Sequence, residues 1–194
     1  MSESAAHTSH HRPTPPRPGA GERQRRLHEI LRVDHAGELA AVHIYRAQAA
    51  VFGATPHKAL SDDLKRMEGE EQVHLDRFET LMRENQVRPT VMTPVWRMAA
   101  LGLGAATALL GEKAAHACTE AVESVISEHY DDQIAETKAR DPELAAELQQ
   151  FRDDEQRHHD HAVEEGAREA PLYPLLSAVI KGGCKLAIRI SEKI

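Results

Sequence analysis

Apolar side chains recur every three to four residues along most of this 194-residue chain, which is the spacing of amphipathic α-helices. The clearest stripe lies between residues 56 and 85, where Leu60, Leu64, Met67 and Leu75 share one helix face. Capping and helix-breaking residues divide the pattern into four long helices, at about 22–54, 56–85, 112–140 and 142–169. Long amphipathic helices with short or helical connections predict an all-α bundle.

Two further segments are unusually apolar. Residues 98–111, MAALGLGAATALLG, carry no charge, yet they are too few to span a bilayer unaided. We predict a short apolar helix there, after a connector, VRPTVMTPVW, that contains two prolines. The last twenty residues, LLSAVIKGGCKLAIRISEKI, predict an amphipathic helix with apolar and basic sides. Together the two helices indicate that the bundle lies against a membrane surface, although a core or capping helix is the alternative for 98–111.

The N-terminal segment MSESAAHTSHHRPTPPRPGA differs from the rest of the chain. It is rich in Pro, Ser and His, and it has neither the apolar core of a secretory signal nor the Arg pattern of a transit peptide. We predict a disordered tail at 1–21 and a single domain at 22–194.

Charge and cysteine content narrow the class of function. The formal net charge of −7 argues against a nucleic-acid partner, which would need a basic surface. Cys118 and Cys184 lie far apart and in no motif, so the sequence predicts neither a disulfide framework nor a cysteine zinc site. Free cysteines fit a reducing compartment.

The spacing Glu-x-x-His is found on two of the predicted helices, as Glu71 with His74 and as Glu155 with His158. Residues three apart share a helix face, so each pair directs a carboxylate and an imidazole at one point. This spacing alone is weak evidence in a chain so rich in Glu and His.

The position of the two pairs is more informative. Glu38 lies mid-helix 33 residues before Glu71, and Glu123 lies mid-helix 32 residues before Glu155, so the halves of the chain repeat one layout. A lone Glu on each of two helices and Glu-x-x-His on each of the other two is the pattern of ferritin-like di-iron carboxylate proteins. We therefore predict that this ferritin-like bundle holds a dimetal centre whose ligands are Glu38, Glu71, His74, Glu123, Glu155 and His158.

The ligand types select the metal. Four carboxylates carry a charge of −4 that neutralises two divalent ions, and hard oxygen with imidazole nitrogen suits iron or manganese. Which carboxylates bridge the ions stays open at this point. Asp34 lies one turn before Glu38 and is predicted to accept the second ring N–H of a ligand histidine, with a surface acid as the alternative. Other nearby groups are predicted to be solvated: Glu68, Glu70, Glu120, Glu128, His159 and His161.

From Leu31 to Ile194 the chain resembles the demethoxyubiquinone hydroxylases of ubiquinone biosynthesis, which are di-iron monooxygenases that associate peripherally with membranes. The stretches that carry the resemblance are LRVDHAGELAAVHIYRAQ, EEQVHLDRFETLM, RPTVMTPVWRMAALGLGAATALLGEKAAHACTEAVE, EHYDDQI, FRDDEQRHHD and GCKLAIRISEKI. The resemblance implies the same six metal ligands and two iron ions. It also implies that His129 and Tyr130 lie near the site and serve electron or proton delivery.

The resemblance further implies the reaction, which is O2-dependent hydroxylation of a polyprenyl demethoxyubiquinol at ring position C6. NADH is allowed as the ultimate electron donor, and the chain has no GxGxxG dinucleotide fingerprint of its own. Because the N-terminal segment does not resemble a transit peptide, we expect a bacterial-type protein on the cytoplasmic side of the inner membrane. A homo-oligomer and a lipid-presenting partner protein both stay open.

Three alternatives remain from the residues alone. A ferritin-like ferroxidase would use the same ligands and would usually assemble into a cage. A quinone or lipid carrier would use the apolar helices and no metal. A helical interaction module would have its Glu-x-x-His pairs on the surface.

Overall fold

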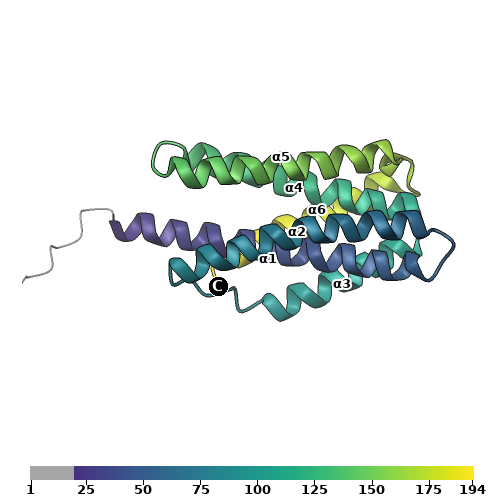
Figure 1. Ribbon diagram of the computed structural model, residues 1–194, viewed down its shortest axis with the longest axis horizontal. Helices are drawn as coiled ribbons and strands as arrows, with labels where there is room; N and C mark the ends of the chain where they lie inside the picture. Colours follow the sequence, from purple (N-terminus) through teal and green to yellow (C-terminus); the bar gives the residue numbers. More distant parts are fainter. Residues whose placement is uncertain (1–19) are drawn as a thin grey trace, which may run out of the picture.

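The computed structural model describes residues 20–194, which form helices and connecting turns without a strand. Figure 1 shows the helices packed along a common direction. In chain order the elements are α1 (Ala20–Gly53), α2 (Lys58–Glu84), α3 (Thr93–Leu109), α4 (Glu112–Thr137), α5 (Pro142–Glu164), the short 3-10 helix η1 (Ala167–Glu169) and α6 (Tyr173–Ser191).

The bundle consists of two antiparallel hairpins, α1–α2 and α4–α5, that lie along each other (Figure 1). Local sequence fixes where these helices begin. The Asp141 carboxylate accepts a hydrogen bond from the backbone N–H of Leu144 at 3.1 Å, and Pro142 occupies the first turn of α5. Gly111 separates α3 from α4 with φ 110°, a conformation that strains residues with a Cβ.

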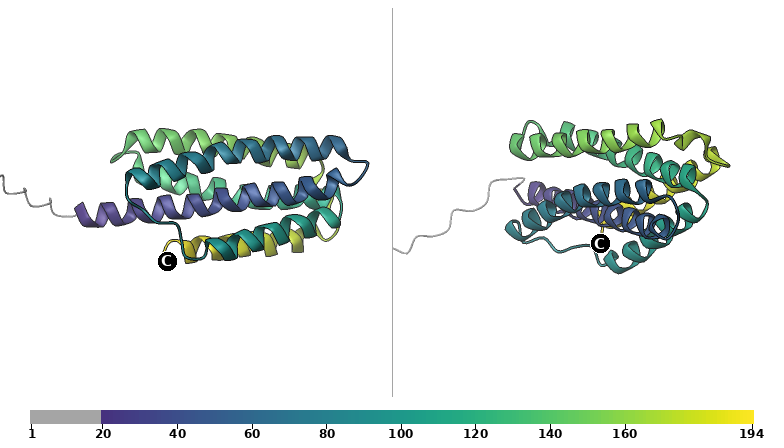
Figure 2. Two further views of the ribbon diagram at one scale, coloured as in Figure 1. Left: turned by 60° about the horizontal axis from the view of Figure 1, so that its bottom comes forward. Right: turned by 45° about the vertical axis from the view of Figure 1, so that its right-hand side comes forward.

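Helices α3 and α6 cover one side of the bundle, as the left view of Figure 2 shows. Trp96 of α3 donates a hydrogen bond to Ser191 of α6 at 3.0 Å, which ties the two helices together. The α3 backbone also packs closely on α1, because a Cβ at Gly104 would overlap the Ile44 backbone. Ile44, Ala100, Cys118, Ala121, Val122 and Ile180 form the apolar layer between these helices and the hairpins.

Two apolar clusters fill the ends of the four-helix bundle and leave its middle to polar side chains. One cluster is rich in large aliphatic and aromatic residues, and the other is rich in alanine. The first cluster consists of Leu31, Phe78, Met82, Val87, Tyr130, Leu144, Leu148 and Phe151, and the second of Ala41, Tyr45, Ala49, Phe52, Leu64, Met67, Ala108 and Ala115.

The predicted fold class is confirmed: the chain is an all-α, ferritin-like bundle with an additional apolar helix and a C-terminal amphipathic helix. The predicted start of the apolar helix at Met98 is wrong, because α3 begins at Thr93 inside the predicted connector. Pro94 lies in its first turn, where proline is tolerated because no N–H bond is needed there. The fourth helix ends at Glu164, before η1. The predicted tail lies almost wholly outside the described residues, and its last two positions belong to α1.

Candidate metal centre

The six predicted ligand side chains meet in the middle of the bundle, between the two apolar clusters. They come from all four long helices, and each is at most 3% exposed. Burial of so many ionisable groups is costly unless a partner of opposite charge joins them. The contributions are Glu38 from α1, Glu71 and His74 from α2, Glu123 from α4, and Glu155 and His158 from α5.

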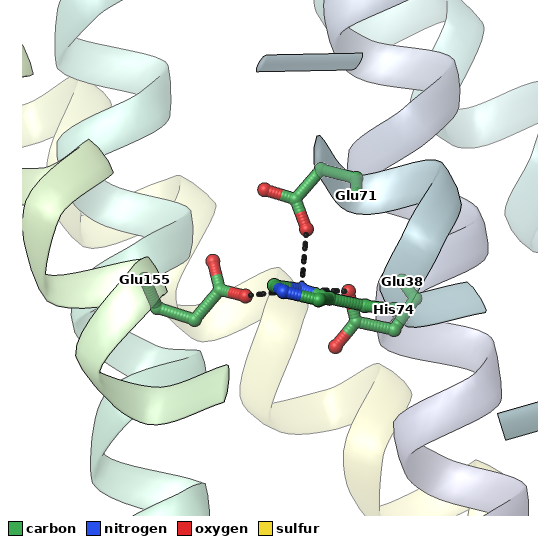
Figure 3. A group of neighbouring side chains, drawn as sticks. All are labelled: Glu38, Glu71, His74 and Glu155. Carbon is green, nitrogen blue, oxygen red and sulfur yellow. Dashed lines mark ion pairs between the residues drawn. The ribbon is translucent and has the colours of Figure 1, made fainter. Parts of the chain in front are cut away.

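The ligand atoms fall into two groups of four, and within each group all atoms lie within 4.8 Å of one another. Glu71 and Glu155 belong to both groups, so the two groups share these two carboxylates. The remaining members are one glutamate and one histidine for each group. The groups are Glu38, Glu71, His74 and Glu155, which Figure 3 shows, and Glu71, Glu123, Glu155 and His158.

Both histidines turn their Nδ1 atoms toward the carboxylates. His74 Nδ1 lies 3.2 Å from Glu155, 3.4 Å from Glu71 and 3.6 Å from Glu38. Dashed lines mark these three ion pairs in Figure 3. His158 Nδ1 lies 2.8 Å from Glu71 and 3.6 Å from Glu155. Each imidazole therefore points its Nδ1 atom at the two shared carboxylates, Glu71 and Glu155.

The donor set fits two divalent ions. Within the described part of the chain, both oxygens of Glu71 and of Glu155 lack a hydrogen-bond partner, as does the second oxygen of Glu38 and of Glu123. Buried polar atoms are nearly always paired in folded proteins, so six unpaired carboxylate oxygens around one point indicate a missing cation. Four carboxylates and two imidazoles match the ligand preference of iron and manganese.

The pKa shifts of the predicted ligands also indicate that the site favours a bound positive charge. Burial raises the pKa of Glu38 and of Glu123 well above the ordinary value, and the neighbouring carboxylates raise both further. Burial alone would lower the pKa of His158, but the adjacent carboxylates of Glu155 and Glu71 raise it to about 11. The pKa of Glu155 is lowered to about 2 because the two histidines outweigh its burial.

The outward ring nitrogens of both histidines bind carboxylates of the opposite helix. His74 Nε2 on α2 lies 3.1 Å from Asp154 on α5, and His158 Nε2 on α5 lies 2.7 Å from Glu70 on α2. Such partners orient metal-binding imidazoles and fix their tautomer. The prediction that Glu70 is merely solvated is therefore wrong. A signal was present in the sequence, because each carboxylate immediately precedes the glutamate of a Glu-x-x-His pair.

Asp34 is buried as predicted for a partner of the site, but its contact is not with a ligand histidine. Gln133 donates a hydrogen bond to Asp34 at 2.8 Å, and His129 Nε2 lies 3.6 Å from the same carboxylate. Gln133 also lies 2.9 Å from His129 Nε2. His129 is 17% exposed, so this buried polar column extends from the interior toward the surface.

Two tyrosines complete the surroundings of the ligands. Tyr130 donates a hydrogen bond to Glu38, and Tyr45 donates one to Glu123, so each hydroxyl crosses to the other hairpin. The sequence pattern did not identify Tyr45. Its signal is the repeated layout, because each tyrosine lies seven residues after the lone glutamate of its own helix.

Three other groups predicted to be solvated are not. Glu120 is 3% exposed and binds Lys181 at 3.3 Å, and His159 lies 3.6 Å from the same carboxylate. His161 is half-buried and lies 2.7 Å from Asp63. These contacts between helices hold the groups away from water, which helical spacing alone does not show. Glu128 is exposed as predicted, and Glu68 is partly buried beside Arg46.

Comparison with known proteins gives consistent matches over most of the chain. Residues 25–191 match the family described as ubiquinone biosynthesis protein COQ7. The chain is 46% identical over 169 residues to the "NADPH-dependent 3-demethoxyubiquinone 3-hydroxylase, mitochondrial" of Bos taurus, covering 85% of this chain and 76% of that protein. It is 45% identical over 168 residues to the "3-demethoxyubiquinol 3-hydroxylase" of Rhodospirillum rubrum, covering 87% and 78%. The "5-demethoxyubiquinone hydroxylase, mitochondrial" of Saccharomyces cerevisiae is 39% identical over 184 residues, with 87% and 78% covered.

Proposed function

This chain belongs to the ubiquinone biosynthesis protein COQ7 family, and from its metal centre we propose a di-iron monooxygenase that hydroxylates demethoxyubiquinol. The observation that carries the proposal is the buried set of four carboxylates and two imidazoles. These side chains form two groups of ligands that have Glu71 and Glu155 in common. The names of the relatives supply the substrate class. The proposed position of attack is the ring carbon that lacks the methoxy group, which we number C6.

The chain's residues would hold one ion with Glu38 and His74, the other with Glu123 and His158, and both with Glu71 and Glu155. When bound, two ferrous ions supply the activation of O2 that ring hydroxylation requires. The protein's own contribution is position and shielding. The apolar clusters at both ends of the bundle exclude water from the ligand atoms, which strengthens every electrostatic interaction among them.

Proton and electron delivery is assigned to the side of the site that contains Glu38. Tyr130 donates its hydroxyl proton to the hydrogen bond with Glu38, and burial raises the pKa of Tyr130 well above its ordinary value, so the hydroxyl stays protonated. His129 lies beside the buried carboxylate of Asp34 and retains contact with solvent. The reductant is a reduced nicotinamide nucleotide, for which we predicted NADH and which the name of the Bos taurus relative gives as NADPH.

The lipid substrate is proposed to arrive from a membrane at the surface of α3 and α6. No helix among residues 20–194 is both long and apolar enough to cross a membrane. Large apolar side chains are nevertheless exposed on both helices, and the isoprenoid tail of the substrate gains about 0.8 kcal/mol for each CH2 that stays in lipid. The exposed residues are Val95, Met98 and Leu109 on α3, and Leu175, Val179 and Leu186 on α6.

This surface fits peripheral association. Arg189 in the last turn of α6 is exposed and adds positive charge to this helix, and anionic lipid headgroups attract such groups. The proposed location is therefore the cytoplasmic side of a bacterial-type inner membrane. A substitution of Val179→Glu should reduce flotation with anionic phospholipid vesicles. Val73→Glu is the control, because Val73 is equally exposed but lies on α2. Equal flotation of both variants would contradict the assignment of this surface.

The enzymatic proposal is tested by expressing the chain in a strain that lacks demethoxyubiquinol hydroxylase and measuring ubiquinone. Restored ubiquinone is expected. Glu71→Ala should abolish both bound iron and product, and His158→Ala, which removes a ligand of one group only, should lose one of the two ions and the product. An iron-free variant that still forms product would contradict the proposal. Gel filtration separates the storage alternative, since a soluble cage would favour a ferroxidase. An iron-free wild-type chain that binds quinone would favour a carrier.

A further inference from the structure

The route by which ions reach the metal centre is indicated by the polar contacts between α2 and α5. The ligand imidazoles are only 4% and 2% exposed, for His74 and His158 respectively. On the outer side of each lies a carboxylate of the opposite helix that is in contact with water. Asp154, next to His74, has 23% of its side chain exposed, and Glu70, next to His158, has 36%.

Each of these two carboxylates also has a cationic partner on its own helix. Arg66 binds Glu70 at 2.8 Å, and Arg157 binds Asp154. The two arginine side chains are 50% and 63% exposed, so their ion pairs are easily exchanged with solvent and dissolved ions. A divalent cation that arrives from water therefore meets an anionic group whose present partner is weakly held.

Apart from the polar column of Asp34, Gln133 and His129, the other sides of the centre are closed. Tyr45 and Tyr130 are each 1% exposed and cover Glu123 and Glu38. Apolar clusters fill both ends of the bundle, and α3 and α6 lie over the face formed by α1 and α4. A hydrated ion would lose its water in those directions without gaining ligands, which is costly.

The inner end of the route is marked by groups that lack a partner. Glu71 and Glu155 are fully buried, and all four of their carboxylate oxygens lack a hydrogen bond within the described part of the chain. Glu71 lies 2.8 Å from the inner nitrogen of His158, and Glu155 lies 3.2 Å from that of His74. An ion that passes either imidazole reaches these oxygens directly.

We propose that divalent metal ions enter through the seam between α2 and α5, with one gate for each ion. Glu70 and His158 form the gate for the ion held by Glu123, and Asp154 and His74 form the gate for the ion held by Glu38. The outer carboxylate would exchange its arginine for the incoming ion, the imidazole would turn aside, and Glu71 and Glu155 would receive the ion. This inference rests on the two-ion centre of the proposed function and adds the path by which it is filled.

The test is the rate at which the metal-free, full-length chain takes up cobalt(II), followed by its visible absorption in a stopped-flow instrument. Glu70→Gln and Asp154→Asn remove the outer charge but keep an oxygen that accepts the imidazole N–H. Each variant is expected to slow uptake of one of the two ions roughly tenfold, because a local charge raises association rates by about that factor or more. Release should slow by a similar factor, so that affinity changes less than either rate.

Matched controls separate a gate from a role in orienting the histidines. Glu68→Gln and Asp153→Asn remove neighbouring charges on the same helices and should leave both rates within about twofold of wild type. Arg66→Ala should accelerate uptake, because it frees Glu70. Unchanged uptake rates in Glu70→Gln and Asp154→Asn, or a loss of affinity through faster release alone, would overturn the route.

The wild-type chain distinguishes failure of the route from failure of the centre. If it binds two cobalt ions while the gate variants keep wild-type rates, only the route is wrong. If it binds fewer than two ions, the dimetal centre of the proposed function is wrong and the route falls with it.

Discussion

The two hairpins of the bundle carry the same ligand layout but differ in what surrounds it. Glu38, Tyr45 and Gln48 on α1 are matched by Glu123, Tyr130 and Gln133 on α4, at a constant separation of 85 residues. In both halves the tyrosine binds the glutamate of the other hairpin. The repeated glutamates are predicted ligands and the repeated tyrosines bind them, so this part of the shared layout fits the proposed two-ion centre, whereas the glutamines lie beyond it.

The surroundings of the two glutamines break this symmetry. Gln48 donates to Thr107 of α3 at 3.2 Å and to the backbone carbonyl of Ala115 at 3.3 Å, so it is enclosed by helix packing. Gln133 instead donates to the carboxylate of Asp34 and lies beside His129, which contacts water. One half of the centre is therefore closed by the apolar helices, while the other has a polar connection to the surface.

The largest effect is expected when the glutamate that belongs to one half is removed. Glu38→Ala and Glu123→Ala should each leave one bound ion per chain, because each residue belongs to a single ligand group. Both should lower hydroxylation by at least about a hundredfold, since O2 activation is assigned to the pair of ions. Iron analysis together with product formation measures this, and two ions retained in either variant would contradict the assignment of ligands.

Removing the hydroxyl of Tyr130 or of Tyr45 should show whether the two halves of the centre contribute differently to turnover. Tyr130→Phe is expected to lower kcat about ten- to hundredfold, because Tyr130 joins Glu38 on the side of the polar connection. Tyr45→Phe removes the equivalent hydrogen bond on the enclosed side and should lower kcat by less than about threefold. Steady-state hydroxylation at equal iron content is the measurement. Equal losses in the two variants would show that the halves act alike.

A smaller difference in kcat is expected between variants of the two glutamines, Gln48 and Gln133. Gln48→Leu should cost about 1–2 kcal/mol of unfolding free energy, because it removes hydrogen bonds that join α1 to α3 and α4, and it should leave kcat nearly unchanged. Gln133→Leu should lower kcat several-fold by releasing His129 and Asp34. Urea unfolding and turnover measured on both variants check this, and the reverse pattern would refute a functional role for the polar column.

The smallest effect on turnover is expected from Asp34, whose ionisation acts on the pH dependence of stability. Burial raises the pKa of Asp34 from 3.8 to about 8, against the opposing influences of Gln133 and Arg26. The folded chain thus keeps a proton that the unfolded chain loses above about pH 4, so this residue's contribution to stability is complete below pH 4 and is lost as pH rises to 8.

The variant Asp34→Asn stays neutral at every pH and should avoid that loss. Its Tm is expected to match wild type at pH 4 and to exceed it by on the order of 10 °C at pH 8, because raising a pKa from 3.8 to about 8 corresponds to roughly 6 kcal/mol. His129 and Tyr130 lie near Asp34, so Tm is measured across the whole range to separate their titration from that of Asp34. A constant difference in Tm would show that Asp34 is ionised in the folded chain.

The helices and the six converging side chains could be predicted from sequence because both depend on spacing along one helix. Glu-x-x-His places two groups on a single face whatever the neighbouring helix does. The partners of those groups depend on contacts between helices. Glu70 and Asp154 reach across to the opposite histidine, and Asp34 turns to Gln133 on another helix, so spacing alone misassigned Glu70 and the partner of Asp34.

The start of α3 was missed for a related reason. Two prolines favoured a connector, but Pro94 falls in the first helical turn, where its missing N–H has no cost. Membrane contact by this helix remains a prediction, because exposed apolar side chains identify a surface and not what it binds.

The central claim is that six side chains from four helices hold two ions that share Glu71 and Glu155. It is tested most directly by titrating the metal-free chain with ferrous iron in the absence of oxygen and counting bound ions. The account predicts two ions per wild-type chain and none held tightly by Glu71→Ala, because loss of a shared ligand weakens both positions. A wild-type chain that binds one ion or none, or a Glu71→Ala chain that still binds two, would contradict it.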